Sequence, residues 1–265
     1  MGTDSTAAAR SLVTRAATLY LQTGNMMNWG RLKKKCPTAG SEELQDCIRT
    51  TLNEWSARIN PELVQESSQT LECSVSQAME TLNPEEREEM KVSVSRLHPC
   101  STLSVTQLDS VILAPPPLED GASLTLENLQ PYWRELERLV WDKKVVAIGT
   151  SDLDKPLLEQ LYLWAQVKPN SNQVNLASCC IMPPDLTAFA KEFDIQLLTH
   201  SDPKELLSEE MFQEALGDSI EECQAQEWSP SWILRYSVIV KTRGIIKSKG
   251  YILQAQRKAP TINSL

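Results

Sequence analysis

The stretch from residue 143 to residue 200 constrains the fold most strongly, because strand-like and helix-like patterns alternate along it. A short β-branched run at residues 145–148 stands between charged residues and Gly149, which is typical of a buried strand. Apolar residues then recur at helical spacing between Leu157 and Trp164. A second strand, a second helix and a third strand are predicted at residues 173–176, 184–193 and 195–199. This alternation through short turns indicates parallel strands joined by right-handed crossovers.

Two folds fit that pattern, an open doubly wound sheet and a closed barrel of eight strands. An open nucleotide-binding sheet usually carries a Gly-rich turn after its first strand, and this chain has nine glycines but no GxGxxG or GxxxxGK. A barrel typically takes about 250 residues, and this chain has 265. We therefore predict an α/β fold, a TIM-type (β/α)8 barrel forming a single domain over residues 19–255. A mobile segment over residues 1–18 and a loose tail over residues 256–265 are expected to flank it.

Composition and charge narrow the class of protein. The formal net charge of −9 argues against a nucleic-acid surface, which needs clustered basic residues. The seven cysteines are odd in number and form no CxxC pair, and no signal peptide or apolar run near 20 residues is visible. We expect a cytoplasmic protein that does not bind membranes. The two histidines stand far apart, so no metal site is predicted.

Three motifs carry a resemblance to a known family. The sequences IGTSD at residues 148–152, NQVN at 172–175 and FDIQLLTHSD at 193–202 resemble strands of the aldo-keto reductases. A closer resemblance, to the regulatory (modifier) subunits of glutamate–cysteine ligase, covers nearly the whole chain. It is carried by that stretch and by LQTGNMMNWGRLKKKCP, LNPEEREEMKVS and RGIIKSKGYILQA, at residues 21–37, 82–93 and 243–255.

One segment departs from that resemblance. The regulatory subunits carry a longer piece around residues 94–104, with an apolar strand and a Ser-rich loop, and this chain has neither. A barrel cannot lose a strand without opening or re-pairing its sheet. We therefore predict a shortened form, an isoform whose barrel is incomplete around residues 94–104.

The resemblance to aldo-keto reductases implies a catalytic Asp, Tyr, Lys and His, which this chain lacks. Residues 108–115 match the strand that precedes the family's His, and Ala114 stands in the place of that His. A methyl group can neither donate a hydrogen bond nor polarise a carbonyl. The family's Lys falls in the missing segment, and no Tyr has the matching context. We predict no catalytic residues, and an NADPH-dependent carbonyl reductase is the alternative that Ala114 argues against.

The cofactor side of the resemblance is better preserved. In aldo-keto reductases a Ser-Asn pair and a Gln hydrogen-bond the nicotinamide amide, and Ser151 and Gln173 match while Asp152 replaces the Asn. A carboxylate only accepts, so the donor half of that contact is lost. Lys247 and Ser248 resemble the family's phosphate contact. No cofactor is required. Residual NADPH binding stays open, as does the interpretation that these four residues are remnants of a barrel rim.

Three further residues have two interpretations each. Cys179 and Cys180 follow a predicted strand, so they are expected in a loop at the barrel face where active sites lie. They are either small packing residues, the favoured interpretation, or a redox-sensitive or partner-contacting pair. His200 ends a predicted strand and lies either at the barrel mouth or, as favoured, in a hydrogen-bonded structural role.

The closer resemblance implies a function. It is that of a non-catalytic barrel forming a heterodimer with the catalytic subunit of glutamate–cysteine ligase, which makes γ-glutamylcysteine in glutathione biosynthesis. Binding is expected to improve glutamate use and to relax feedback inhibition by glutathione. That effect requires preferential binding to one conformer of the partner. Trp29, Trp228 and Trp232 are candidate interface anchors, with a place in the core favoured for each.

Overall fold

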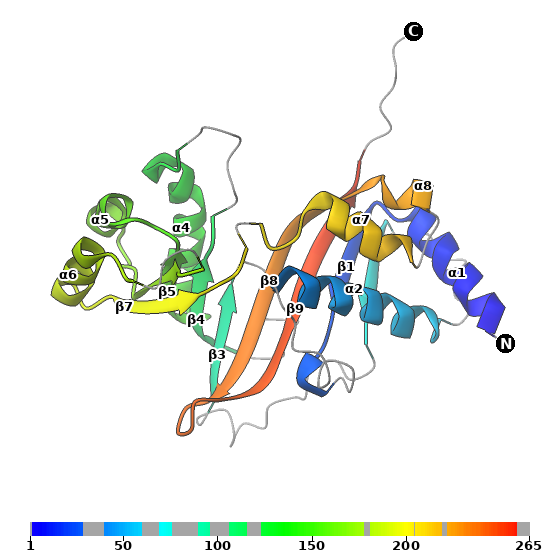
Figure 1. Ribbon diagram of the computed structural model, residues 1–265, viewed down its shortest axis with the longest axis horizontal. Helices are drawn as coiled ribbons and strands as arrows, with labels where there is room; N and C mark the ends of the chain where they lie inside the picture. The colour runs from blue at the N-terminus through cyan, green and yellow to red at the C-terminus, as the bar shows by residue number, and fades with distance from the viewer. Residues whose placement is uncertain are drawn as a thin grey trace, which may run out of the picture. The chain divides into compact units, whose positions relative to one another are not determined.

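Figure 1 shows the computed structural model of the chain, which divides into two compact units. It describes residues 2–28, 40–59, 69–75, 90–95, 106–115, 123–177, 181–203, 205–218 and 222–258. Unit 1 comprises residues 1–80, 205–235 and 248–265, and unit 2 comprises residues 81–204 and 236–247. The single domain predicted over residues 19–255 stays a prediction. No helix in the described ranges is long and apolar enough to cross a membrane.

Unit 2 is built on parallel strands with helical crossovers. Its parallel strands are β3 (Met90–Ser95), β4 (Leu108–Leu113), β5 (Val145–Ser151), β6 (Ser171–Asn175) and β7 (Gln196–His200). They neighbour one another in that order, each pair parallel. Helix α4 (Leu126–Trp141) leads into β5, α5 (Lys155–Trp164) joins β5 to β6, and α6 (Pro184–Glu192) joins β6 to β7. The alternation predicted over residues 143–200 is confirmed.

Local sequence explains where α5 begins and what it buries. The Oδ1 atom of Asp154 accepts a hydrogen bond from the backbone N–H of Leu157 at 3.0 Å, which caps the helix. Pro156 lies in the first turn, where its missing N–H removes no helical bond. Leu158 and Leu161 are fully buried. The cap and the apolar spacing therefore place α5 where the sequence predicts it.

Unit 1 has its own core and contains β1, β2 and parts of β8 and β9. Its helices are α1 (Gly2–Arg15), α2 (Gly40–Ser56), α7 (Glu209–Gly217), α8 (Glu222–Ala225) and the short 3-10 helix η1 (Met26–Asn28). Its strands β1 (Thr18–Gln22) and β2 (Thr70–Ser74) are parallel, and β1 is antiparallel to β9 (Ile245–Arg257). The strand order is β2-β1-β9-β8, where β8 spans Trp228–Val240. Trp228 is fully buried, as favoured, and Trp29 lies outside the described residues.

The described parts of the two chain ends lie in a helix and a strand, and residues 259–265 of the predicted tail lie outside the described residues. Residues 2–15 form α1, in which Val13 is only 1% exposed and belongs to the core of unit 1. Residues 256 and 257 continue β9, and the Arg257 guanidinium donates to the backbone carbonyl of Val13 at 2.5 Å. Packing in the core of unit 1 and this hydrogen bond hold residues 2–15 and residues 256–257 in place.

The parallel strands do not close into a barrel among the described residues. Strand β7 pairs with β6, and the other end of the parallel set, β3, neighbours β8 rather than a further parallel strand. A tight turn over residues 241–244, with Gly244 at φ 62°, joins β8 to its neighbour β9. Strands joined by so short a turn are antiparallel, whereas barrel strands need crossovers of a dozen or more residues. The described sheet is therefore only partly parallel.

Candidate functional site

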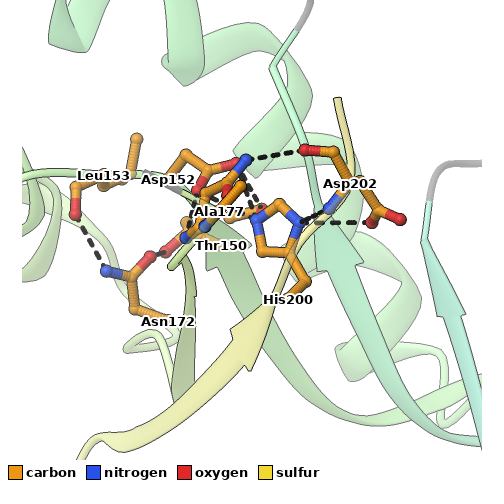
Figure 2. Close-up of polar contacts among 9 residues, drawn as sticks. Thr150, Asp152, Leu153, Asn172, Ala177, His200 and Asp202 are labelled. Carbon is orange, nitrogen blue, oxygen red and sulfur yellow. Dashed lines mark hydrogen bonds and ion pairs between the residues drawn. The ribbon is translucent and has the colours of Figure 1, made fainter. Parts of the chain in front are cut away.

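Polar side chains gather where β5, β6 and β7 end (Figure 2). Ser151 pairs with Gln173 across β5 and β6, and Asn175 pairs with His200 across β6 and β7. Because the carboxyl ends of parallel strands meet at one edge of a sheet, ligand sites of α/β folds form there. The structure therefore brings together Ser151 and Gln173, two of the four residues predicted to contact a cofactor.

His200 is held between two carboxylates. Its Nε2 atom lies 3.0 Å and 3.1 Å from the two carboxylate oxygens of Asp152, and its Nδ1 atom lies 3.2 Å from Oδ2 of Asp202. The hydrogen bond to Asp152, followed by the one to Asp202, raises the pKa of His200 to about 9 against the opposing effect of burial. A pKa of about 9 favours the protonated ring at neutral pH, in which both nitrogens are donors to carboxylates. The hydrogen-bonded role favoured for His200 is confirmed.

Asp152 is the most highly connected residue of the site. It follows β5 with φ 61°, a left-handed conformation that Asp and Asn tolerate better than most residues, and its N–H donates to the carbonyl of Gln173 at 2.7 Å. Its carboxylate also accepts from the N–H of Asn175 at 2.9 Å and from the hydroxyl of Ser151 at 3.0 Å. Burial alone would raise the pKa of Asp152. The hydrogen bond and the charge of His200, followed by the hydrogen bonds from Ser151 and Asn175, lower this pKa. Both carboxylate oxygens are engaged.

Further hydrogen bonds join the loops that follow the three strands. The side-chain amide of Asn175 donates to the carbonyl of Asp202 at 2.8 Å, and its Oδ1 atom accepts from the N–H of Ala177 at 2.9 Å. The N–H of Leu176 donates to the carbonyl of His200 at 2.9 Å. Asp202 and Asn175 were not predicted as site residues. Their signal was present in the NQVN and THSD motifs, but nothing in the sequence linked those motifs to each other.

The residues present do not fit a nicotinamide amide. Asp152 offers no donor, and the hydroxyl of Ser151 donates to it at 3.0 Å. Lys247 and Ser248 lie within β9, which β8, β3 and β4 separate from β5 in the strand order. Lys247 belongs to unit 2 and Ser248 to unit 1. Of the four predicted residues, the described structure therefore brings together Ser151 and Gln173.

Other predicted residues are only partly described. Cys179 and Cys180 lie outside the described residues, so their packing, redox or partner role stays a prediction. Ala114 directly follows β4, at the strand end where the resemblance implies a His. In the part of the chain that the structure describes, no three His, Cys, Asp or Glu side chains are arranged to hold a metal.

The ion cluster predicts a pH-dependent stability. Because the pKa of His200 is raised from 6.5 to about 9, its contribution is complete below pH 6.5 and is lost as pH rises through about 9. Because the pKa of Asp152 is lowered, its contribution is present above 3.8 and is lost as pH falls through the folded-state pKa. The difference in unfolding free energy between the wild type and His200→Asn is therefore expected to shrink between about pH 6 and about pH 10.

The expected change is about 1–2 kcal/mol, because the shift alone corresponds to about 3 kcal/mol but the Asp152 side chain is 46% exposed and solvent screens the pair. Urea denaturation of both proteins at the two pH values measures it. An equal difference at both values would contradict the ion cluster.

Comparison with known proteins gives the family. No model of a known protein family matches the chain. The glutamate–cysteine ligase regulatory subunit of Homo sapiens is 68% identical over 273 aligned positions, covering 97% of this chain and 99% of the relative. The Rattus norvegicus protein of the same name is also 68% identical, with the same coverage. An aldo/keto reductase structure from Brucella melitensis is similar over 38% of this chain and 37% of its own, at 23% identity and a TM-score of 0.31.

The alignment of 273 positions is longer than this chain of 265 residues, so the human relative has residues that this chain lacks. Apart from that difference, the identity extends over nearly the full length of both proteins. The chain belongs to the family of glutamate–cysteine ligase regulatory subunits.

Proposed function

We propose that this chain is a non-catalytic regulatory subunit that forms a heterodimer with the catalytic subunit of glutamate–cysteine ligase. In that complex it improves the use of glutamate and relaxes feedback inhibition by glutathione. The observation that carries the proposal is the 68% identity to a regulatory subunit, which covers 99% of that relative. The cytoplasm is the compartment we propose, on the cysteine usage described above.

Two features support a role without catalysis. Ala114, at the end of β4, has no polar side-chain atom to orient a carbonyl substrate. The hydroxyl of Tyr251 donates to Glu43 at 3.2 Å, and burial, followed by the charge of Glu43, raises the pKa of Tyr251 well above its usual range. A proton donor works best with a pKa near the operating pH, so this environment suits a structural Tyr.

Regulation by binding has a simple thermodynamic requirement. A partner can shift a conformational equilibrium only by as much as its affinities for the two states differ. We propose that this chain binds preferentially the conformer of the catalytic subunit that uses glutamate well and binds glutathione weakly. Couplings of this kind are typically about 1–3 kcal/mol, or about 5- to 150-fold in an inhibition constant.

The shortened segment is compatible with this function. In the described structure β3 pairs in parallel with β4, with Val94 opposite Val111, so the strand before residues 96–105 is part of the sheet. We propose that the residues absent near positions 94–104 are not needed for binding.

Complex formation with the purified catalytic subunit is the first test. Size exclusion of the mixture is expected to give a 1:1 complex. A matched chain with the relatives' segment restored between residues 94 and 104 serves as control and is expected to form the same complex. Binding by the restored chain alone would show that the segment is required and that this form is not a regulator.

Oxidation of NADPH in the presence of simple aldehydes tests the reductase alternative. No change in absorbance above the rate without protein is expected. Sustained turnover by the isolated chain would contradict a non-catalytic role despite Ala114.

A further inference from the structure

We propose that the Asp152–His200–Asp202 cluster fills, from within the chain, the position that the resemblance assigns to the nicotinamide amide, so that this protein holds no nicotinamide there. The inference concerns the end of the β5–β7 sheet and is independent of binding to a catalytic subunit.

The side chains at this strand end offer few hydrogen-bond donors to a ligand. A primary amide presents both donors and an acceptor, so its site must offer acceptors and at least one donor. Asp152 accepts only, and the single hydroxyl proton of Ser151 is directed to Asp152 at 3.0 Å. The three matching positions therefore keep one side-chain amide, on Gln173, where the family pattern has two, on Asn and Gln.

His200 lies against the carboxylate of Asp152. Its Nε2 atom lies within 3.1 Å of both oxygens of Asp152, so His200 already occupies the carboxylate that a ligand amide would have to bind. The ring is itself enclosed, with 11% of the side chain exposed and its other nitrogen on Asp202. A ligand would have to separate a largely buried imidazolium from its carboxylate partners, which is strongly unfavourable.

Asp152 is anchored through both its backbone and its side chain. Its N–H donates to the carbonyl of Gln173 at 2.7 Å while its carboxylate accepts the N–H of Asn175 at 2.9 Å. Moving the carboxylate aside would therefore release a backbone donor at the end of β6 as well as His200. The cluster is fixed to two strands and is not a loose side chain that a ligand could push away. It also closes the three loops onto one another, which gives it a structural role of its own.

Histidine NMR tests the proposal directly, because the chain contains only two histidines. A His98→Gln variant assigns the remaining ring signals to His200. NADPH added to the wild type at about 1 mM, well above the Kd of an ordinary cofactor site, is expected to leave the His200 signals unmoved. The same signals are expected to titrate near pH 9 in the wild type and closer to 6.5 in Asp152→Asn, which keeps the side-chain shape but removes the charge.

Two results would overturn the proposal. One is saturable movement of the His200 signals by NADPH in the wild type. If that movement is lost in Gln173→Ala, the nicotinamide amide is the group of NADPH that binds there. The other is an ordinary His200 titration near 6.5 in the wild type, because the cluster would then not form. Neither readout depends on enzymatic activity or on the catalytic subunit.

Discussion

Glu137→Ala is expected to lower the free energy of unfolding of unit 2 by about 2–4 kcal/mol. Glu137 lies in α4 and is 3% exposed. Its Oε1 atom accepts the backbone N–H groups of Gln166 and Val167 at 2.7 Å and 2.9 Å. The indole N–H of Trp133, one turn earlier, donates to the carbonyl of Val167 at 3.1 Å. Two side chains of α4 thus hold the segment that leads from α5 to β6, and alanine leaves two partly buried donors without their acceptor.

Glu137→Gln is the matched control, since it keeps an acceptor oxygen of nearly the same shape and removes only the charge. Its expected cost is about 1–2 kcal/mol, because neutral hydrogen bonds are about half as strong as charge-assisted ones. Urea denaturation followed by tryptophan fluorescence gives the stability. Hydrogen exchange at the amides of residues 166 and 167 gives the local effect and should become fast only in the alanine variant. Equal protection in both variants would show that the carboxylate does not hold this segment.

Gly149→Ala is expected to cost about 3 kcal/mol, through overpacking between two central strands. A Cβ atom at this position would lie 2.2 Å from the hydroxyl oxygen of Ser171 and 2.6 Å from its backbone carbonyl oxygen. The hydroxyl can rotate away, but the carbonyl cannot, because Gly149 and Ser171 are directly opposed in the parallel ladder of β5 and β6. The strands must therefore separate, which also disturbs Ser151 and Gln173 two pairs further along.

Gly217→Ala separates this clash from the general effect of replacing a glycine. Gly217 is the last residue of α7, and a Cβ there would meet nothing within 4 Å. Alanine is expected to be neutral or stabilising by up to about 1 kcal/mol, because it favours helix and restricts the unfolded chain. Thermal denaturation of the two variants beside the wild type measures the contrast. Similar stabilities for both would contradict the close approach at Gly149.

Local patterns predicted the strands and helices of residues 143–200 well, because hydrophobic spacing and caps act over a few residues. The apolar spacing of α5 and the strand at residues 145–148 are examples. The pairing of β1 with β9 and the position of β3 beside β8 join segments far apart in the chain. No local pattern specifies those pairings, and the predicted barrel was therefore only partly correct.

In the candidate site, too, some contacts could be expected from the sequence and others could not. Ser151 and Gln173 lie opposite each other on two neighbouring strands, and the resemblance to aldo-keto reductases had assigned both to one contact. The contact between His200 and Asp152 joins residues 48 positions apart in the chain. Asp152 was recognised as a departure from the aldo-keto reductase pattern and His200 as a strand-end residue. Their pairing became visible only when the three strand ends were placed side by side.

Glutathione inhibition of the catalytic subunit, titrated with and without a saturating amount of this chain, tests the proposed function most directly. A regulatory subunit is expected to raise the inhibition constant for glutathione by about 5- to 150-fold and to lower the KM for glutamate in the same samples. Gly217→Ala, which is expected to fold normally, should act like the wild type. An unchanged inhibition constant in a sample where the 1:1 complex has formed would contradict the proposed regulation.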